Sequence, residues 1–187
     1  LTTVSAGTFV LDKDAAGTDA VAGDILVEGG TLQWADSHQV ADTATITQTD
    51  GTVSFSGESE TFANFTRAGG FTETLGSGAV ISITDTLNMS GGSSFNLNSP
   101  STVMADTMVF TGGSIAIGGG SAKLHIGSGG LTMQGTAINM NGRDSQLVLD
   151  GDLTVLASSS SARIRHTSAD AFTTGGLDLG GVNRTFN

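Results

Sequence analysis

The chain has 187 residues and a formal net charge of −11, and 28 of its residues are glycine. Only 7 Lys and Arg residues stand against 18 Asp and Glu residues, which argues against nucleic acid or an anionic membrane surface as partner, because both attract clustered positive charge. Cysteine is absent, so disulfides and thiolate metal sites are excluded. No apolar run approaches the roughly 18 residues of a membrane-spanning helix, so we expect no membrane insertion.

A glycine followed by Thr or Ser and then by alternating apolar residues recurs along the chain, and we call these glycines the anchor glycines. The mean step between them is about 21 residues. Repeats of this length are typical of solenoids, in which neighbouring turns bury a shared core. The anchor glycines are Gly7, Gly30, Gly51, Gly70, Gly92, Gly113 and Gly135.

Each period contains three short segments with strand-like alternation. One precedes the anchor glycine, as at Ile25 and Val27, and one follows it, as in 31–34. A third lies in the remainder of the period, as at Leu147 and Leu149. Alternation with period two indicates a strand with one buried face, and glycine permits the corner between strands. We therefore predict an all-β fold, a right-handed parallel β-helix with three strands per coil and about eight coils.

Other folds fit the pattern poorly. No stripe with a period of 3.6 residues persists, so helices are not expected. A β-sandwich would not repeat its positions every 21 or so residues, and the consensus of leucine-rich repeats is missing. We expect residues 1–187 to be a single β-helix segment. Because both termini lie in strand-like patterns, we expect it to be an excerpt of a longer repeat protein.

Four segments resemble the autotransporter-associated β-strand repeat, also called the passenger-associated transport repeat. They are 29–34, 38–43, 50–57 and 59–62, which read GGTLQW, HQVADT, DGTVSFSG and SETF. Residues 175–187 resemble another recurrent segment of the same proteins. The resemblance implies a β-helical passenger of a large secreted or cell-surface bacterial protein, exported by type V secretion. Such repeats carry no catalytic residues, so the resemblance implies an extracellular structural or adhesive rod rather than an enzyme.

Three alternatives remain open: a carbohydrate-active β-helix, an extracellular glycan-binding module and a self-assembling filament subunit. The expected partners are accordingly neighbouring repeats of the same chain, surface glycans or another cell, and further copies stacked end to end. No catalytic residue and no cofactor is predicted from the sequence.

Five acidic residues recur near the predicted corners and form the best candidates for chemistry. Calcium is one hypothesis, because it binds several carboxylate and carbonyl oxygens. The interpretation we favour is that each carboxylate closes its own turn by accepting backbone N–H groups. The candidates are Asp24, Asp42, Asp85, Asp106 and Asp152.

The remaining conspicuous side chains have structural interpretations. Trp34 occupies an inward position and is expected to fill the core, while Arg163 and Arg165 should point outward around an inward Ile164. The threonine-rich stretch 43–49 suggests a flat threonine ladder of the kind that binds ice, but the threonines do not recur at one register, so we do not expect ice binding. Three histidines are separated by several coils and are not expected to cluster: His38, His125 and His166.

Overall fold

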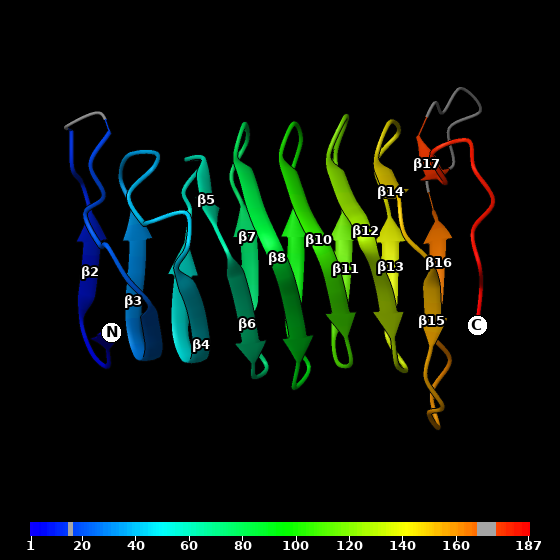
Figure 1. The fold of residues 1–187 in the computed structure, drawn as a ribbon, viewed down its shortest axis with the longest axis horizontal. Coiled ribbons are helices and arrows are strands. Elements are labelled where there is room, and N and C mark those ends of the chain that lie inside the picture. Colours follow the sequence, from blue (N-terminus) through cyan, green and yellow to red (C-terminus); the bar gives the residue numbers. More distant parts are fainter. Residues whose placement is uncertain (15–16, 168–174) are drawn as a thin grey trace.

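The computed structural model describes residues 1–14, 17–167 and 175–187. These residues contain no helix and form a parallel β-solenoid of about seven turns with about 22 residues per turn. The turns follow one another along a rod, with the two termini near opposite ends (Figure 1). The parallel β-helix expected from the sequence is therefore confirmed. Among the described residues, no helix has the length and apolar character that crossing a membrane requires.

The C-terminal turns are longer than the mean step of about 21 residues between the anchor glycines. Arg165 contacts Asn139, which lies 26 residues earlier in the chain. Thr185 bonds to Asp152, which lies 33 residues earlier. The last anchor glycine is Gly135, so the mean step between the anchor glycines does not include these longer turns.

Seventeen strands lie in the described residues, and most are short because a glycine or a polar corner ends them. They are β1 (Thr2–Val4), β2 (Thr8–Leu11), β3 (Ile25–Trp34), β4 (Thr45–Ser54), β5 (Glu60–Phe62), β6 (Asn64–Ala68), β7 (Thr72–Leu75), β8 (Val80–Ser90), β9 (Ser94–Leu97), β10 (Thr102–Phe110), β11 (Ser114–Ile117), β12 (Lys123–Met133), β13 (Ala137–Met140), β14 (Gln146–Leu149), β15 (Leu153–Val155), β16 (Arg163–His166) and β17 (Gly176–Asp178).

Parallel pairing between successive turns arranges these strands into three faces. Face A consists of 2–4, 25–27, 45–48, 64–68, 86–90, 107–110, 130–133 and 153–155, and an isolated parallel bridge between Leu153 and Phe186 extends it to 185–187. Face B consists of 60–62, 80–83, 102–105, 123–126, 146–149 and 176–178. Face C consists of 8–11, 31–34, 52–54, 72–75, 94–97, 114–117, 137–140 and 163–166.

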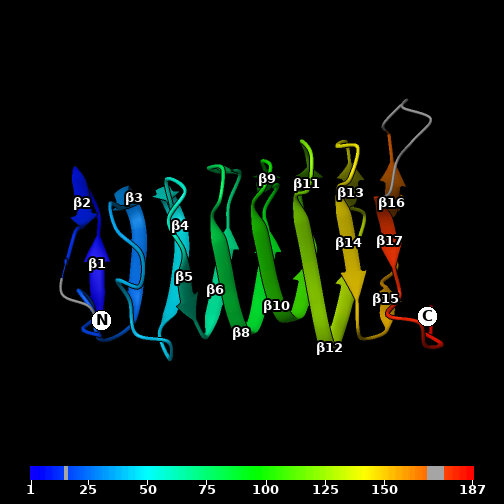
Figure 2. The same cartoon turned by 90° about the horizontal axis from the view of Figure 1, so that it is seen from above.

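The longest strands bend around a corner and contribute to two faces. β8, β10 and β12 run from face B into face A and lie side by side along the rod (Figure 2). Their register shifts between Ala105 and Thr107, where the backbone leaves one face for the next. Most turns therefore contribute one short segment to each face, and we call that segment a rung.

The core lies between the three faces and is built from the inward side chain of every second residue. Val103 on β10, for example, pairs with Ile81 on β8 and with Leu124 on β12, and all three are buried. Apolar side chains from Val4 to Leu153 form one continuous buried cluster. Full burial of such a side chain contributes about 1.5–3 kcal/mol, which a single isolated turn could not achieve.

Anchor glycines are required where neighbouring turns meet closely at a corner. Gly113 has φ +95°, and a Cβ atom there would overlap the carbonyl oxygen of Ser93 in the preceding turn. Gly51 has φ +75°, and its Cβ would overlap the carbonyl of Gly30. Both the backbone conformation and the space therefore exclude a side chain at these corners.

The ladder on face C is interrupted between its third and fourth rungs. β7 is the edge strand of a five-stranded sheet, whereas 52–54 of β4 belong to the larger, twelve-stranded sheet. The turn that bridges the interruption is short, since Gln48 and Arg67 occupy equivalent positions only 19 residues apart. This interruption coincides with a group of buried polar side chains described below.

Candidate functional site

Two of the acidic candidates occupy one register position at the corner before face A. Asp24 accepts the backbone N–H of Thr45 through Oδ1 at 2.8 Å. Asp152 accepts the N–H of Thr185 in the same way at 2.9 Å. In each case the donor lies in the following turn. The sequence favours a donor in the carboxylate's own turn, and for these two residues that interpretation is wrong. The reason is geometric, because parallel stacking places the next turn only about 4.8 Å away.

Asp85 and Asp106 lie one residue earlier than that register position. Asp106 accepts bonds from the Ser128 hydroxyl at 3.2 Å and from the Gly129 N–H at 3.4 Å, again in the next turn. Asp85 accepts the hydroxyl of its neighbour Thr86 at 3.2 Å. These carboxylates therefore act mainly as acceptors that connect or stiffen the corners.

The five carboxylates considered as calcium ligands are distributed over separate positions. Asp42 is exposed and lies on a different corner, after the bridge between Val21 and Val40. In the part of the chain that the structure describes, no group of three or more His, Cys, Asp or Glu side chains is placed to hold a metal ion. A calcium ion would thus depend on backbone carbonyls and water for most of its ligands.

One imidazole and one carboxylate form a close pair on the outer surface, where face B meets face A. His125 Nε2 lies 2.6 Å from Asp150 Oδ2, and Arg184 Nη2 lies 3.8 Å from the other carboxylate oxygen. Arg184 also donates from Nε to the Leu149 carbonyl at 3.1 Å. The side chains of His125 and Asp150 are 34% and 43% exposed, so water screens this pair.

A shallow depression of about 310 Å³ adjoins this pair. Ile83, Met104 and Ala105 line it, with Asp106 and His125 at its polar side. A carboxylate and an imidazole could take part in proton transfer, yet the depression is small and open. It could hold at most a small part of an extended ligand.

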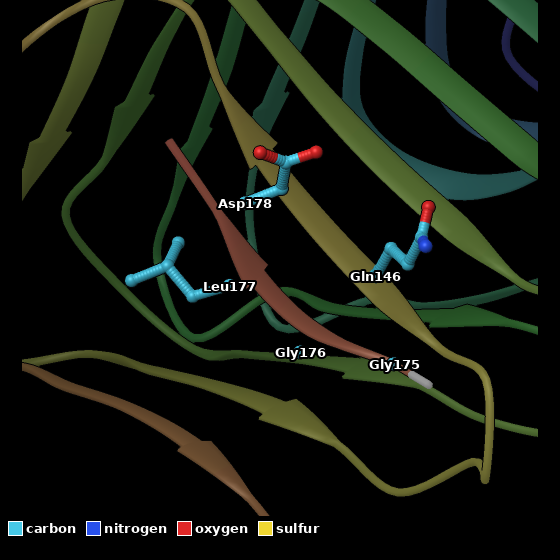
Figure 3. Close-up of a pocket in the computed structure, with 5 residues that line it drawn as sticks. All are labelled: Gln146, Gly175, Gly176, Leu177 and Asp178. Atoms are coloured by element: carbon cyan, nitrogen blue, oxygen red, sulfur yellow. The ribbon is translucent and has the colours of Figure 1, made fainter. Parts of the chain in front are cut away.

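A second depression, of about 220 Å³, lies where β17 covers β14. The side chains of Gln146 and Asp178 flank it, while Leu177 points away from Gln146 on the other side of β17 (Figure 3). Gly175 and Gly176 contribute backbone alone. One carboxylate and one amide offer hydrogen bonds but no paired acid and base.

A buried carboxylate that sequence reasoning missed lies inside the solenoid on β5. Glu60 Oε2 accepts the indole N–H of Trp34 at 2.7 Å and the backbone N–H groups of Gln39 at 2.6 Å and Val40 at 3.1 Å. Its Oε1 accepts the N–H of Thr61 at 2.9 Å. Trp34 is buried as expected, but its indole also orients this carboxylate. The available signal was the 21-residue offset between Gln39 and Glu60, which lie in two of the segments that carry the family resemblance.

A buried guanidinium at the interruption of face C was also missed. Arg67 donates from Nε to Gln48 Oε1 at 2.9 Å and from Nη1 to the Ser94 carbonyl at 3.1 Å. Its guanidinium carbon lies 5.8 Å and 5.5 Å from the ring centres of Phe65 and Phe95. Its Nη2 is buried without a hydrogen-bond partner among the described residues. The alternation of Asn64, Phe65, Thr66 and Arg67 already places Arg67 inward.

Glu73 on β7 is the buried acidic counterpart of Arg67. Burial raises the pKa of the Glu73 carboxyl to about 8, although the positive charge of Arg67 acts in the opposite direction. Burial also lowers the pKa of Arg67 to about 10, and here Glu73 opposes the change. Glu73 is therefore mostly neutral at pH 7, while Arg67 keeps its charge through hydrogen bonds and the two aromatic rings.

The remaining candidates from the sequence are exposed or contact the backbone. Arg163 and Arg165 are exposed on either side of the half-buried Ile164, as predicted. His166 contacts the carbonyl of Gly142 at 3.2 Å, and His38 is exposed. The histidines belong to no metal-binding group among the residues that the structure describes.

Comparison with protein-family models, with curated proteins and with solved structures found no match to this chain.

Proposed function

We propose that this chain is a segment of a structural or adhesive rod at the outer surface of a bacterial cell, similar to the passenger of an autotransporter. The observation that carries the proposal is the continuity of the parallel solenoid along the chain. About seven stacked turns share one apolar core, and their polar corner side chains bond to the next turn. Such an architecture forms a long and stiff rod, since each turn is held by its neighbours.

The residues behind the family resemblance support a mechanical role. Gln39 and Glu60 come from two of the resembling segments, and both are buried. Glu60 accepts bonds from the preceding turn, and Gln39 donates to the Lys13 carbonyl at 3.1 Å. These side chains hold three consecutive turns together and expose no reactive group.

The charge distribution suits a rod that stays apart from similar surfaces. The net charge of −11 keeps copies in solution from associating side by side at low salt. Outward positions carry mainly Ser, Thr, Asn and Asp, which present many weak hydrogen-bonding groups to a target surface.

Labelling of bacterial cells that express the whole protein tests this proposal. Antibodies raised against the 187-residue chain should label intact cells as strongly as permeabilised cells, and protease added outside should remove the signal. An antibody against a cytoplasmic protein of the same cells is the control. Labelling restricted to permeabilised cells would contradict the proposal.

A carbohydrate-active or glycan-binding β-helix is the second candidate function. The pair of His125 and Asp150 beside Asp106 and the adjoining depression favours it. Polysaccharide turnover that Asp106→Asn and His125→Gln both abolish would establish an enzyme. Binding on a glycan array without turnover would establish a binding module. If neither turnover nor binding is found, the rod remains the proposed function.

A further inference from the structure

The outward side of face A carries two straight rows of mainly threonine and asparagine side chains, which we call the threonine face. Pairing between the turns places residues from successive rungs side by side. From β4 onward every rung contributes at least one threonine. The rungs contribute Thr45 and Thr47, Asn64 and Thr66, Thr86 and Asn88, Thr107 and Val109, Gly130 and Thr132, Asp152 and Thr154, and Thr185 and Asn187.

This register corrects in part the expectation that threonines do not recur at one position, since each row has threonine at four of its seven positions. Thr47 pairs with Thr66, 19 residues later, and Thr66 pairs with Asn88, 22 residues later. Because the turns differ in length, a constant spacing in the sequence misses the alignment. Stacking of the turns restores it.

The threonine face is a rigid two-dimensional array. Neighbouring rungs are about 4.8 Å apart along the rod, and two outward residues of one strand are about 7 Å apart. The strands of face A lie side by side along the whole rod (Figure 1). Threonine is β-branched and has few rotamers, so its hydroxyl and methyl groups are held in place before any partner binds.

The chemistry of the threonine face differs from that of the other two faces. Outward positions of face B include Lys123, His125 and Asp178, and those of face C include Arg163 and Arg165. The threonine face contains no Lys, Arg, His, Glu or aromatic residue in the rungs named above, and Asp152 is its one charged member. It is therefore nearly neutral and offers hydroxyl, amide and methyl groups.

These properties indicate which kind of partner the threonine face binds. A neutral array does not attract a polyanion, and a face without aromatic rings has no platform on which a sugar ring could stack. Neither of the two depressions described above is lined by a residue of the array, so they offer a small molecule no site on the threonine face. The threonine face matches a solid whose own surface repeats in two dimensions and presents uncharged hydrogen-bonding groups.

We propose that the threonine face binds the surface of ice. Water oxygens in hexagonal ice repeat in two dimensions at spacings close to those of the array. Threonine hydroxyls can take the place of lattice waters, while the methyl groups fill the hollows between them. Each contact is weak, but the contacts of successive rungs add because the rod holds them in register.

The test uses the purified 187-residue chain. The two measurements are inhibition of ice recrystallisation and partitioning into a growing ice hemisphere. An acidic protein of similar size without such an array is the reference. Thr66→Tyr and Thr132→Tyr place a bulky side chain in the array. Thr102→Tyr is the matched control, because Thr102 is a half-buried outward residue on face B.

We expect the wild-type chain and Thr102→Tyr to inhibit recrystallisation and to enter the ice. The concentration that gives half-maximal inhibition should rise about tenfold or more for each of the other two variants. Circular dichroism and thermal melting establish that all the variants fold. Equal activity of all three variants, a wild-type chain no more active than the reference protein, or retention on crystalline cellulose or chitin in place of ice would each overturn the proposal. Ice binding by the threonine face is independent of the rod function, which cell labelling tests separately.

Discussion

Glu60 accepts the indole N–H of Trp34 at 2.7 Å inside the solenoid core. The two residues come from different turns, so this bond joins the turns from within, whereas Asp24 and Asp152 join neighbouring turns at the surface. The N-terminal turns therefore depend on a polar contact in a region that is otherwise apolar.

Substitution of Glu60 by Ala should destabilise the chain strongly. The change leaves the Trp34 indole and the N–H groups of Gln39 and Val40 buried without their acceptor. We expect a loss of about 3 kcal/mol or more in the free energy of unfolding, measured by urea denaturation. Glu28→Gln is the control, because Glu28 is exposed, and its effect should stay within about 0.5 kcal/mol. Equal effects of the two changes would contradict the role of Glu60.

Stability should fall as the pH rises through neutrality, owing to Glu73. The folded-state pKa of Glu73 is about 8, above the ordinary value of 4.5, so the folded state binds the proton more tightly than the unfolded state does. This contribution is fully present below pH 4.5 and is lost as the pH rises to about 8. The measurement is urea denaturation across this interval.

Glu73→Gln is the matched variant for this pH dependence, since the amide keeps the shape and cannot ionise. The difference in unfolding free energy between wild type and variant should change across the interval, because other carboxyl groups cancel in the comparison. A difference that stays constant with pH would show that Glu73 is not the group responsible.

Replacement of Gly113 by Ala should disrupt the corner between faces A and C. The added Cβ would overlap the Ser93 carbonyl oxygen, and the backbone has φ +95°. We expect a loss of about 2 kcal/mol or more, visible as a lower melting temperature. Gly23→Ala is the control, because a Cβ there meets no atom within 4 Å and its φ is not in the positive range. A Gly113 variant that melts like the Gly23 variant would contradict this account of the anchor glycines.

Asp24→Ala tests whether the corner carboxylates act as hydrogen-bond acceptors or as calcium ligands. Loss of the bond to the Thr45 N–H should cost about 1 kcal/mol with or without calcium. Asp42→Ala, at an exposed position, should have little effect. The melting temperature of the wild-type chain should not change when a chelator is added. A marked rise on addition of calcium, lost in Asp24→Ala, would instead support the calcium hypothesis.

Local patterns in the sequence determined the fold class. The alternation at Ile25 and Val27 and the glycine at Gly113 act within a few residues, so strands, corners and inward positions follow from them. The inward place of Trp34 and the outward places of Arg163 and Arg165 were predicted correctly for the same reason.

Only the tertiary structure decided which residues of different turns lie side by side. The partner of Gln48 is Arg67, 19 residues later, whereas the partner of Asp152 is Thr185, 33 residues later. These offsets depend on how each corner and loop packs, and no local pattern specifies them. For that reason the threonine rows and the partners of Glu60, Arg67 and Glu73 could not be derived from the sequence. Register between turns is a property of the stacked solenoid, while alternation is a property of each strand.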